Sequence, residues 1–236
     1  MKTLANVFAA VGLLVLGYWA VEFAGARLYQ ARETRRFARE RLTGQRSADK
    51  PSPFKSAETA ERPYPSSGSA VAVLAIPRMG LSTIVVEGAG EGELKLGPGH
   101  IRGTSLPGGG GNIGVAGHRD TFFRPLRLIR RNDTITVTTH VQEYRYRVIS
   151  TEIVGPDDVQ VLYPTEHEML TLVTCYPFDF IGPAPKRFVV RADCVDCPSS
   201  ASQPAPPVRH TRQDWLSCNA LTRHGSQPSR CLRSIQ

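Results

Sequence analysis

Cysteine is scarce in the part of the chain that can fold into a domain. The sequence has five cysteines, and four of them lie from about Asp193 onward: Cys194, Cys197, Cys218 and Cys231. Only Cys175 lies in the preceding region. A small disulfide-stabilised scaffold needs paired cysteines spread through its domain, so this distribution excludes that class.

The chain also lacks a basic stripe on the region expected to fold. Its formal net charge is +8, but much of the positive charge lies between Arg27 and Arg46 and in the C-terminal stretch. Nucleic-acid binding needs basic side chains gathered on one folded face, so no nucleic-acid partner is expected. Basic charge beside an apolar segment instead favours contact with the anionic headgroups of a membrane.

A long apolar run lies between Leu4 and Ala26, with Glu22 as its only charge. Its length is close to the ~20 residues that span a hydrocarbon core. No small-residue cleavage site stands out, so residues 1–26 are predicted to form a transmembrane signal anchor rather than a cleaved signal peptide. A buried helix of a soluble protein is the alternative. Only Lys2 precedes the run and six arginines follow it between Arg27 and Arg41, so the positive-inside rule alone would leave the next domain in the cytoplasm.

Residues 27–69 are predicted to connect this anchor to the domain. Gly25–Leu42 is rich in arginine and glutamate and is typical of a helix, which then gives way to a linker. Ser47–Ser69 is dense in proline, serine, alanine and lysine. Such a composition cannot bury a core, so it predicts an extended linker that holds the domain away from the membrane.

Residues 70–192 have the pattern of a single, mainly β domain. The predicted strands are Ala70–Pro77, Leu81–Glu87, Asn112–Gly117, Thr134–Thr138, Gln142–Glu152, Met169–Thr174 and Arg187–Ala192. Helix is limited to one or two turns within Phe122–Ile129, and Leu94–Gly97 is ambiguous. Many short strands with Gly and Pro between them favour a closed barrel or a sandwich, which the pattern does not separate. Prolines interrupt residues 193–236, which are predicted to be a disordered tail.

Three reactive side chains stand at or near the ends of predicted strands. The run Thr171–Cys175 ends on a cysteine, Arg187 opens the strand that follows, and His118 comes just after the run Asn112–Ala116. A thiol nucleophile, a proton carrier and an anion stabiliser would be assembled if these strand ends converge. The alternative is that Cys175 only packs, as most buried cysteines do.

Two of these roles have competitors elsewhere in the sequence. His100 could replace His118 as the proton carrier, although its Gly-Pro-Gly-His setting favours a structural role. Arg191 lies four residues after Arg187 and on the same face of the strand by the period of two. The spacing after Cys175 and the Pro-Lys-Arg context favour Arg187.

Several motifs in this order resemble the sortase family of cysteine transpeptidases. The motifs are Thr-Leu-Val-Thr-Cys at 171–175, Gly-His-Arg-Asp at 117–120, Gly-Pro-Gly-His at 97–100 and Gly-Thr-Ser-Leu-Pro-Gly at 103–108. The stretches Cys175–Asp179 and Gly182–Arg187 are most similar to the class D branch. The resemblance covers about residues 70–192 and implies a closed barrel of about eight strands. It also implies that Cys175, His118 and Arg187 are catalytic, and that Thr174 adds a backbone or hydroxyl donor.

The resemblance implies a membrane-anchored transpeptidase. Such an enzyme would cleave an LPxTG-like C-terminal sorting signal of a protein substrate and pass the thioacyl group to a cell-surface amine, such as a peptidoglycan precursor or a protein lysine. Ile149–His167 would form the wall that recognises the peptide. The domain would lie outside the cytoplasm on a single-pass anchor. This is the opposite of the orientation that the arginines after the apolar run predict by the positive-inside rule. A thiol peptidase that transfers to water, and a non-catalytic peptide-binding barrel, are the alternatives.

Neither a metal nor a cofactor is expected for this chemistry. The Cys194-x-x-Cys197 pair, followed by His210, Cys218, His224 and Cys231, could offer zinc ligands. The later residues lack a second tightly spaced pair, so the prediction is that no metal binds.

Overall fold

The computed structural model describes residues 2–48, 64–180 and 182–197. The helical elements are α1 (Lys2–Ala48), η1 (Pro77–Met79), α2 (Glu91–Leu96), η2 (Arg124–Leu128) and η3 (Val159–Leu162). The strands are β1 (Ala70–Ile76), β2 (Leu81–Glu87), β3 (Gly99–His100), β4 (Asn112–Gly117), β5 (Thr134–Thr138), β6 (Glu143–Val154), β7 (Met169–Tyr176) and β8 (Lys186–Asp196). The seven predicted strands are all present, and β3 is an eighth that the sequence did not predict because it has only two residues.

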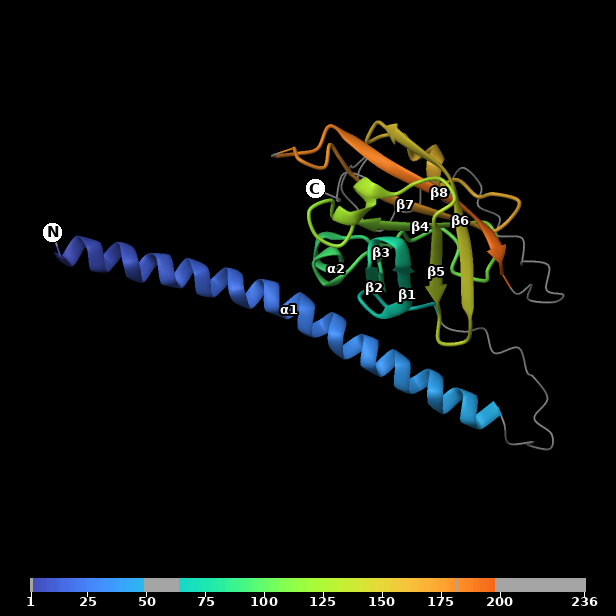
Figure 1. The fold of residues 1–236 in the computed structure, drawn as a ribbon, viewed down its shortest axis with the longest axis horizontal. Coiled ribbons are helices and arrows are strands. Elements are labelled where there is room, and N and C mark those ends of the chain that lie inside the picture. The colour runs from blue at the N-terminus through green and yellow to red at the C-terminus, as the bar shows by residue number, and fades with distance from the viewer. Residues whose placement is uncertain (1, 49–63, 181, 198–236) are drawn as a thin grey trace, which may run out of the picture.

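The strands close into a barrel in the order β1-β2-β3-β4-β7-β8-β6-β5, with β1 and β5 paired to complete the ring (Figure 1). Two of the ladders are parallel, β2 with β3 and β4 with β7, and the others are antiparallel. This confirms the mainly β closed barrel of about eight strands with short helices and decides between barrel and sandwich. The ambiguous segment Leu94–Gly97 belongs largely to the short helix α2.

Side-chain alternation divides the apolar residues into a barrel interior and an outer cluster. Leu170 and Leu172 on β7 point inward with residues from the neighbouring strands. Val173 and Cys175, one residue out of phase, join Ala116 and Val189 on the outer face of β4, β7 and β8. Successive strand residues point to opposite faces of the sheet. Two polar side chains at neighbouring strand ends can therefore meet only if both lie on the interior face or both on the outer face.

The long helix α1 packs its second half on the outside of the barrel. Phe37 is 2% exposed and lies in a cluster with Ile84 and Val86 of β2. The Gln30 side chain accepts a hydrogen bond from Ile84 N (2.7 Å) and donates one to Leu96 O (2.8 Å). The partners are backbone groups of β2 and α2, so α1 is fixed by both packing and hydrogen bonding.

The N-terminal end of α1 points away from the barrel (Figure 1). Its large apolar side chains are exposed, among them Leu4, Phe8, Leu13 and Leu14. In the described part of the chain, no helix is long and apolar enough to cross a membrane. The predicted transmembrane character of residues 1–26 is therefore not confirmed, although the segment from residue 2 is helical. Most of the predicted linker, residues 49–63, lies outside the described residues.

The last strand is longer than predicted. We expected it to end at Ala192, but β8 continues to Asp196, where Cys194 pairs with Tyr146 and Asp196 with Arg145 of β6. The reason is tertiary: β6 is a strand of twelve residues, and it pairs with β8 along this extension. Cys194 also forms a disulfide with Cys197, and both pack against the interior cluster. The predicted tail therefore begins within β8, and its residues 198–236 lie outside the described part.

Candidate active site

The strand register brings Cys175, Arg187 and His118 to one edge of the sheet. Cys175 on β7 pairs directly with Arg187 on β8. On the other side of β7, Thr174 pairs with Gly117, the last residue of β4, so His118 follows at the level of Cys175. Ala116, Val173 and Val189 all belong to the outer cluster. The period of two then puts His118, Cys175 and Arg187 on this same outer face.

Burial shapes the protonation of the cysteine and the histidine. Cys175 is a free cysteine that is 4% exposed. Burial raises the pKa of its thiol, while the charges of Arg187 and Arg119 act to lower that pKa. Burial likewise lowers the pKa of His118, against the charges of Asp120 and Glu91. Both shifts favour the neutral thiol and the neutral imidazole, so His118 is in the form that can accept a proton.

The Arg187 guanidinium is fixed in place beside Cys175. The residue is 1% exposed, and its Nη1 donates to the carbonyl oxygens of Ala184 and Lys186, both at 3.1 Å. A buried cation held by hydrogen bonds is a preorganised group for stabilising negative charge. The competitor Arg191 pairs with Thr171, four residues further along β8. At about 3.3 Å per residue it lies ~13 Å from the Cys175 end of the strand.

Thr174 has a structural contact that the sequence did not predict. Its phase on β7 matches Leu172 in the barrel interior, opposite to Cys175. Its hydroxyl donates to Gly117 O at 2.7 Å and links β7 to the end of β4. The implied role of this hydroxyl as a donor in the site is therefore not supported, because the side chain lies on the other face of the sheet.

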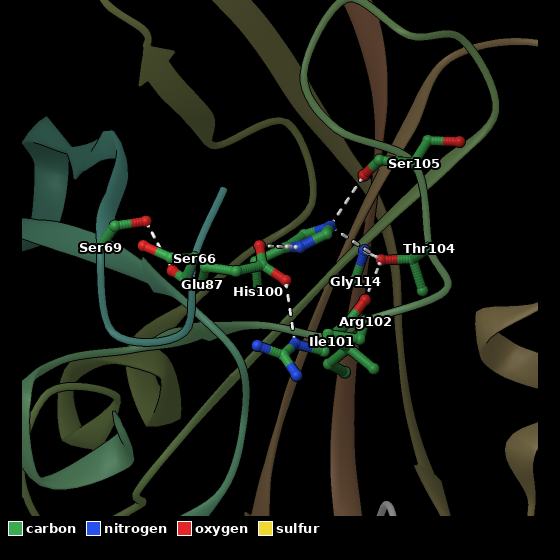
Figure 2. A network of polar contacts seen from close by, with 9 residues as sticks. All are labelled: Ser66, Ser69, Glu87, His100, Ile101, Arg102, Thr104, Ser105 and Gly114. Carbon is green, nitrogen blue, oxygen red and sulfur yellow. Dashed lines mark hydrogen bonds and ion pairs between the residues drawn. The ribbon is translucent and has the colours of Figure 1, made fainter. Parts of the chain in front are cut away.

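His100 belongs to a separate polar network inside the barrel (Figure 2). It pairs with Val115, an interior residue, so it faces away from Cys175. Its Nδ1 lies 2.8 Å from Glu87 Oε2, and its Nε2 lies 3.0 Å from Ser105 O and 3.1 Å from Thr104 Oγ1. The other Glu87 oxygen is 3.4 Å from Arg102 Nε. The network joins β2, β3 and the following loop, which supports the structural role favoured from the sequence.

The structure also reveals a polar residue of the site to which the sequence assigned no role. Arg119 follows His118, and its guanidinium donates to backbone carbonyls of the loop between β7 and β8. The Gly-His-Arg-Asp motif pointed to the position. Its partners were not predictable, because they lie in a loop without regular structure.

One group of side chains in the described part of the chain has metal-ligand geometry. The ligand atoms of Glu168, Cys194 and Cys197 lie within 4.8 Å of one another. The two sulfur atoms form a disulfide, however, and zinc binds cysteine as the thiolate. This group lies at the far end of β8 from Arg187 and takes no part in the site. The other cysteines and histidines considered as zinc ligands lie outside the described residues.

Comparison with known proteins agrees with this fold. Residues 74–195 match the family model described as the sortase domain. The chain is 35% identical over 127 residues to sortase D of Bacillus subtilis, a match that covers 53% of this chain and 64% of that protein. It is 33% identical over 92 residues to the putative sortase YwpE of the same organism, covering 37% of this chain and 87% of the relative.

Solved structures give the same result. A Clostridium perfringens sortase D5 transpeptidase aligns with a TM-score of 0.52 at 27% identity, covering 56% of this chain and 83% of that one. Sortase A of Corynebacterium diphtheriae aligns with a TM-score of 0.51 at 28% identity, covering 56% and 63%. The barrel is that of a sortase-type domain. The chain belongs to the sortase family, and its likeness to the Bacillus subtilis and Clostridium perfringens proteins is consistent with class D. The chain spans less than two thirds of the Bacillus subtilis sortase D.

The two histidines can be separated by exchanging each for glutamine. We expect His100→Gln to lose ~1–3 kcal/mol of stability, because Glu87 is left buried with a poorer partner, while peptide cleavage by the folded protein persists. We expect His118→Gln to melt near the wild-type temperature but to lose ~10²–10⁴-fold in cleavage rate. Thermal melting and cleavage of an LPxTG-like peptide measure both effects, with the exposed His140→Gln, outside the predicted wall, as the control for cleavage. The reverse pattern would make His100 the proton carrier.

Proposed function

We propose that the protein is a cysteine transpeptidase that cleaves an LPxTG-like sorting signal and transfers the acyl fragment to an amine. The observation that carries this proposal is the register of β4, β7 and β8. It places His118, Cys175 and Arg187 on one outer face at the same edge of a sortase-family barrel. Sortases are cysteine transpeptidases, and this arrangement supplies the groups that such a reaction requires.

In the proposed first half-reaction, the Cys175 sulfur attacks the scissile carbonyl carbon as the thiol proton passes to His118. Arg187 stabilises the oxyanion that forms on the carbonyl oxygen. The carbon–nitrogen bond then breaks, the leaving amine takes the proton from His118, and a thioester remains on Cys175. In the second half-reaction, an incoming amine gives a proton to His118 and attacks the thioester. Cys175 leaves with that proton, and a new amide bond is formed.

Buried apolar side chains of the predicted wall pack in the same cluster as the nucleophile. Val161 and Leu162 of η3 share this cluster with Cys175, and η3 lies within the predicted wall 149–167. Asn112 holds the segment against β4, because its Nδ2 donates to Val161 O (3.0 Å) and Tyr163 O (3.1 Å). By likeness to the sortase family, the proposed substrate is a protein with a C-terminal sorting signal, and the proposed acceptor is an amine such as a peptidoglycan precursor or a protein lysine.

We also propose that the catalytic domain lies outside the cytoplasm on a single-pass membrane anchor. The support is the apolar run in the sequence, the exposed apolar side chains at the start of α1, and the Cys194–Cys197 disulfide, which suits an oxidising compartment. Protease treatment of intact cells tests this placement. Digestion of the domain while a cytoplasmic marker survives is expected, and full protection of the domain would contradict it.

Product analysis separates the proposed reaction from its two alternatives. The full chain is incubated with an LPxTG-like peptide, with and without a primary-amine acceptor, and the products are weighed by mass spectrometry. We expect the acyl fragment joined to the acceptor, and no product from Cys175→Ala, because that variant lacks the nucleophile.

Hydrolysis alone, at a rate unaffected by the acceptor, would instead identify a thiol peptidase. Peptide binding by the wild type without any cleavage would identify a non-catalytic barrel. A Cys175→Ala variant that cleaves at the wild-type rate would remove Cys175 as the nucleophile.

A further inference from the structure

The Arg119 side chain donates three hydrogen bonds to the loop between β7 and β8. Its Nη1 donates to Pro177 O at 3.1 Å, and its Nη2 donates to Phe180 O at 2.8 Å and to Gly182 O at 2.9 Å. The guanidinium carbon also lies 5.9 Å from the centre of the Phe180 ring. A planar fork can serve several carbonyl groups at once, which a single ammonium group cannot do with the same geometry.

This loop joins the two strands that carry the nucleophile and the anion stabiliser. It leaves β7 one residue after Cys175 and enters β8 one residue before Arg187. Its far end is bound by Arg187, which donates to Ala184 O and Lys186 O. Arg119 and Arg187 thus both donate to carbonyl groups of this loop, and Arg119 is covalently next to His118.

We propose that Arg119 is a positioning residue that couples the His118 end of β4 to the loop beside Cys175, so that the two reacting side chains keep their relative placement. This inference rests on the proposed function of the same site. A misplacement of about 1 Å can cost ~100-fold in rate, so a side chain that fixes the loop can influence turnover without touching the substrate. Arg119 also acts through its charge, which lowers the pKa of the Cys175 thiol.

Two substitutions separate the hydrogen bonds from the charge. Arg119→Ala removes both, and Arg119→Lys keeps the positive charge but loses the fork. If Arg119 positions the site, both variants lower kcat by ~100-fold with little change in KM. Only Arg119→Ala should move the pH midpoint of Cys175 alkylation upward, because the positive charge that favours the thiolate is gone. Arg124→Ala is the matched control, since Arg124 is an exposed arginine at the start of η2, seven residues after the end of β4, and it should behave as the wild type.

Hydrogen exchange tests the same inference without any turnover. Amides of the loop around Phe178–Phe180 should exchange about tenfold faster in both Arg119 variants than in the wild type, because local opening is no longer opposed by the fork. Those of β1 and β5 should be unchanged, which also shows that the variants are folded.

Unchanged loop exchange together with unchanged kcat would overturn the positioning role. So would an Arg119→Lys variant with full activity, which would leave only an effect of charge. If the wild type itself neither cleaves nor transfers the sorting peptide, the proposed function fails, and the exchange data still decide whether Arg119 fixes the loop.

Discussion

The register of three neighbouring strands is the constraint on which the site depends. The β4–β7 ladder runs without interruption from Asn112↔Met169 to Gly117↔Thr174. The β7–β8 ladder is equally regular from Met169↔Asp193 to Tyr176↔Lys186. A slip by one residue would turn Cys175 into the barrel interior, because side chains alternate between the two faces. The register irregularities of the barrel lie elsewhere, in β1–β2 and β6–β8. The regular part of the sheet is thus the part that aligns the reactive groups.

Burying the Arg187 guanidinium costs free energy unless it has hydrogen-bond acceptors. Carbonyl groups at the end of the loop after β7 are among these acceptors. An isolated guanidinium is expensive to remove from water. Arg187 lies almost fully buried and donates to the carbonyls of Ala184 in the loop and Lys186 at the start of β8, and Arg119 donates to three further loop carbonyls. The hydrogen bonds that make the buried charge tolerable therefore also fix the loop. Burial raises the pKa of the Cys175 thiol, and the positive charges of Arg187 and Arg119 limit that rise.

The strand pattern of the sequence left barrel and sandwich open, and the closed barrel was predicted from the resemblance to sortases, whose motifs occur here in the right order. The same motifs predicted Cys175, His118 and Arg187 as the site residues. The Thr-Leu-Val-Thr-Cys run predicts a buried strand ending on a cysteine, and Arg187 falls in the strand predicted to follow. Their direct pairing comes from the β7–β8 register, which the sequence does not contain. The choice between His118 and His100 depended on motif context alone. The structure separates them physically, since His100 lies on the interior face with Glu87.

Other features depended on tertiary contacts that no local pattern records. The two residues of β3 are too few to show a period, and β8 extends to Asp196 through its pairing with β6. Gln30 fixes α1 through backbone groups more than fifty positions away. A glutamine within a helix rich in arginine and glutamate gives no local sign of such a contact.

A covalent acyl-enzyme tests the central claim most directly. The full chain is mixed briefly with an LPxTG-like peptide, quenched in acid, and weighed intact before the modified residue is mapped by fragmentation. The account predicts a mass gain equal to the acyl fragment, located on Cys175 and absent from Cys175→Ala. An adduct that persists in Cys175→Ala, or one that maps to another residue, would contradict it.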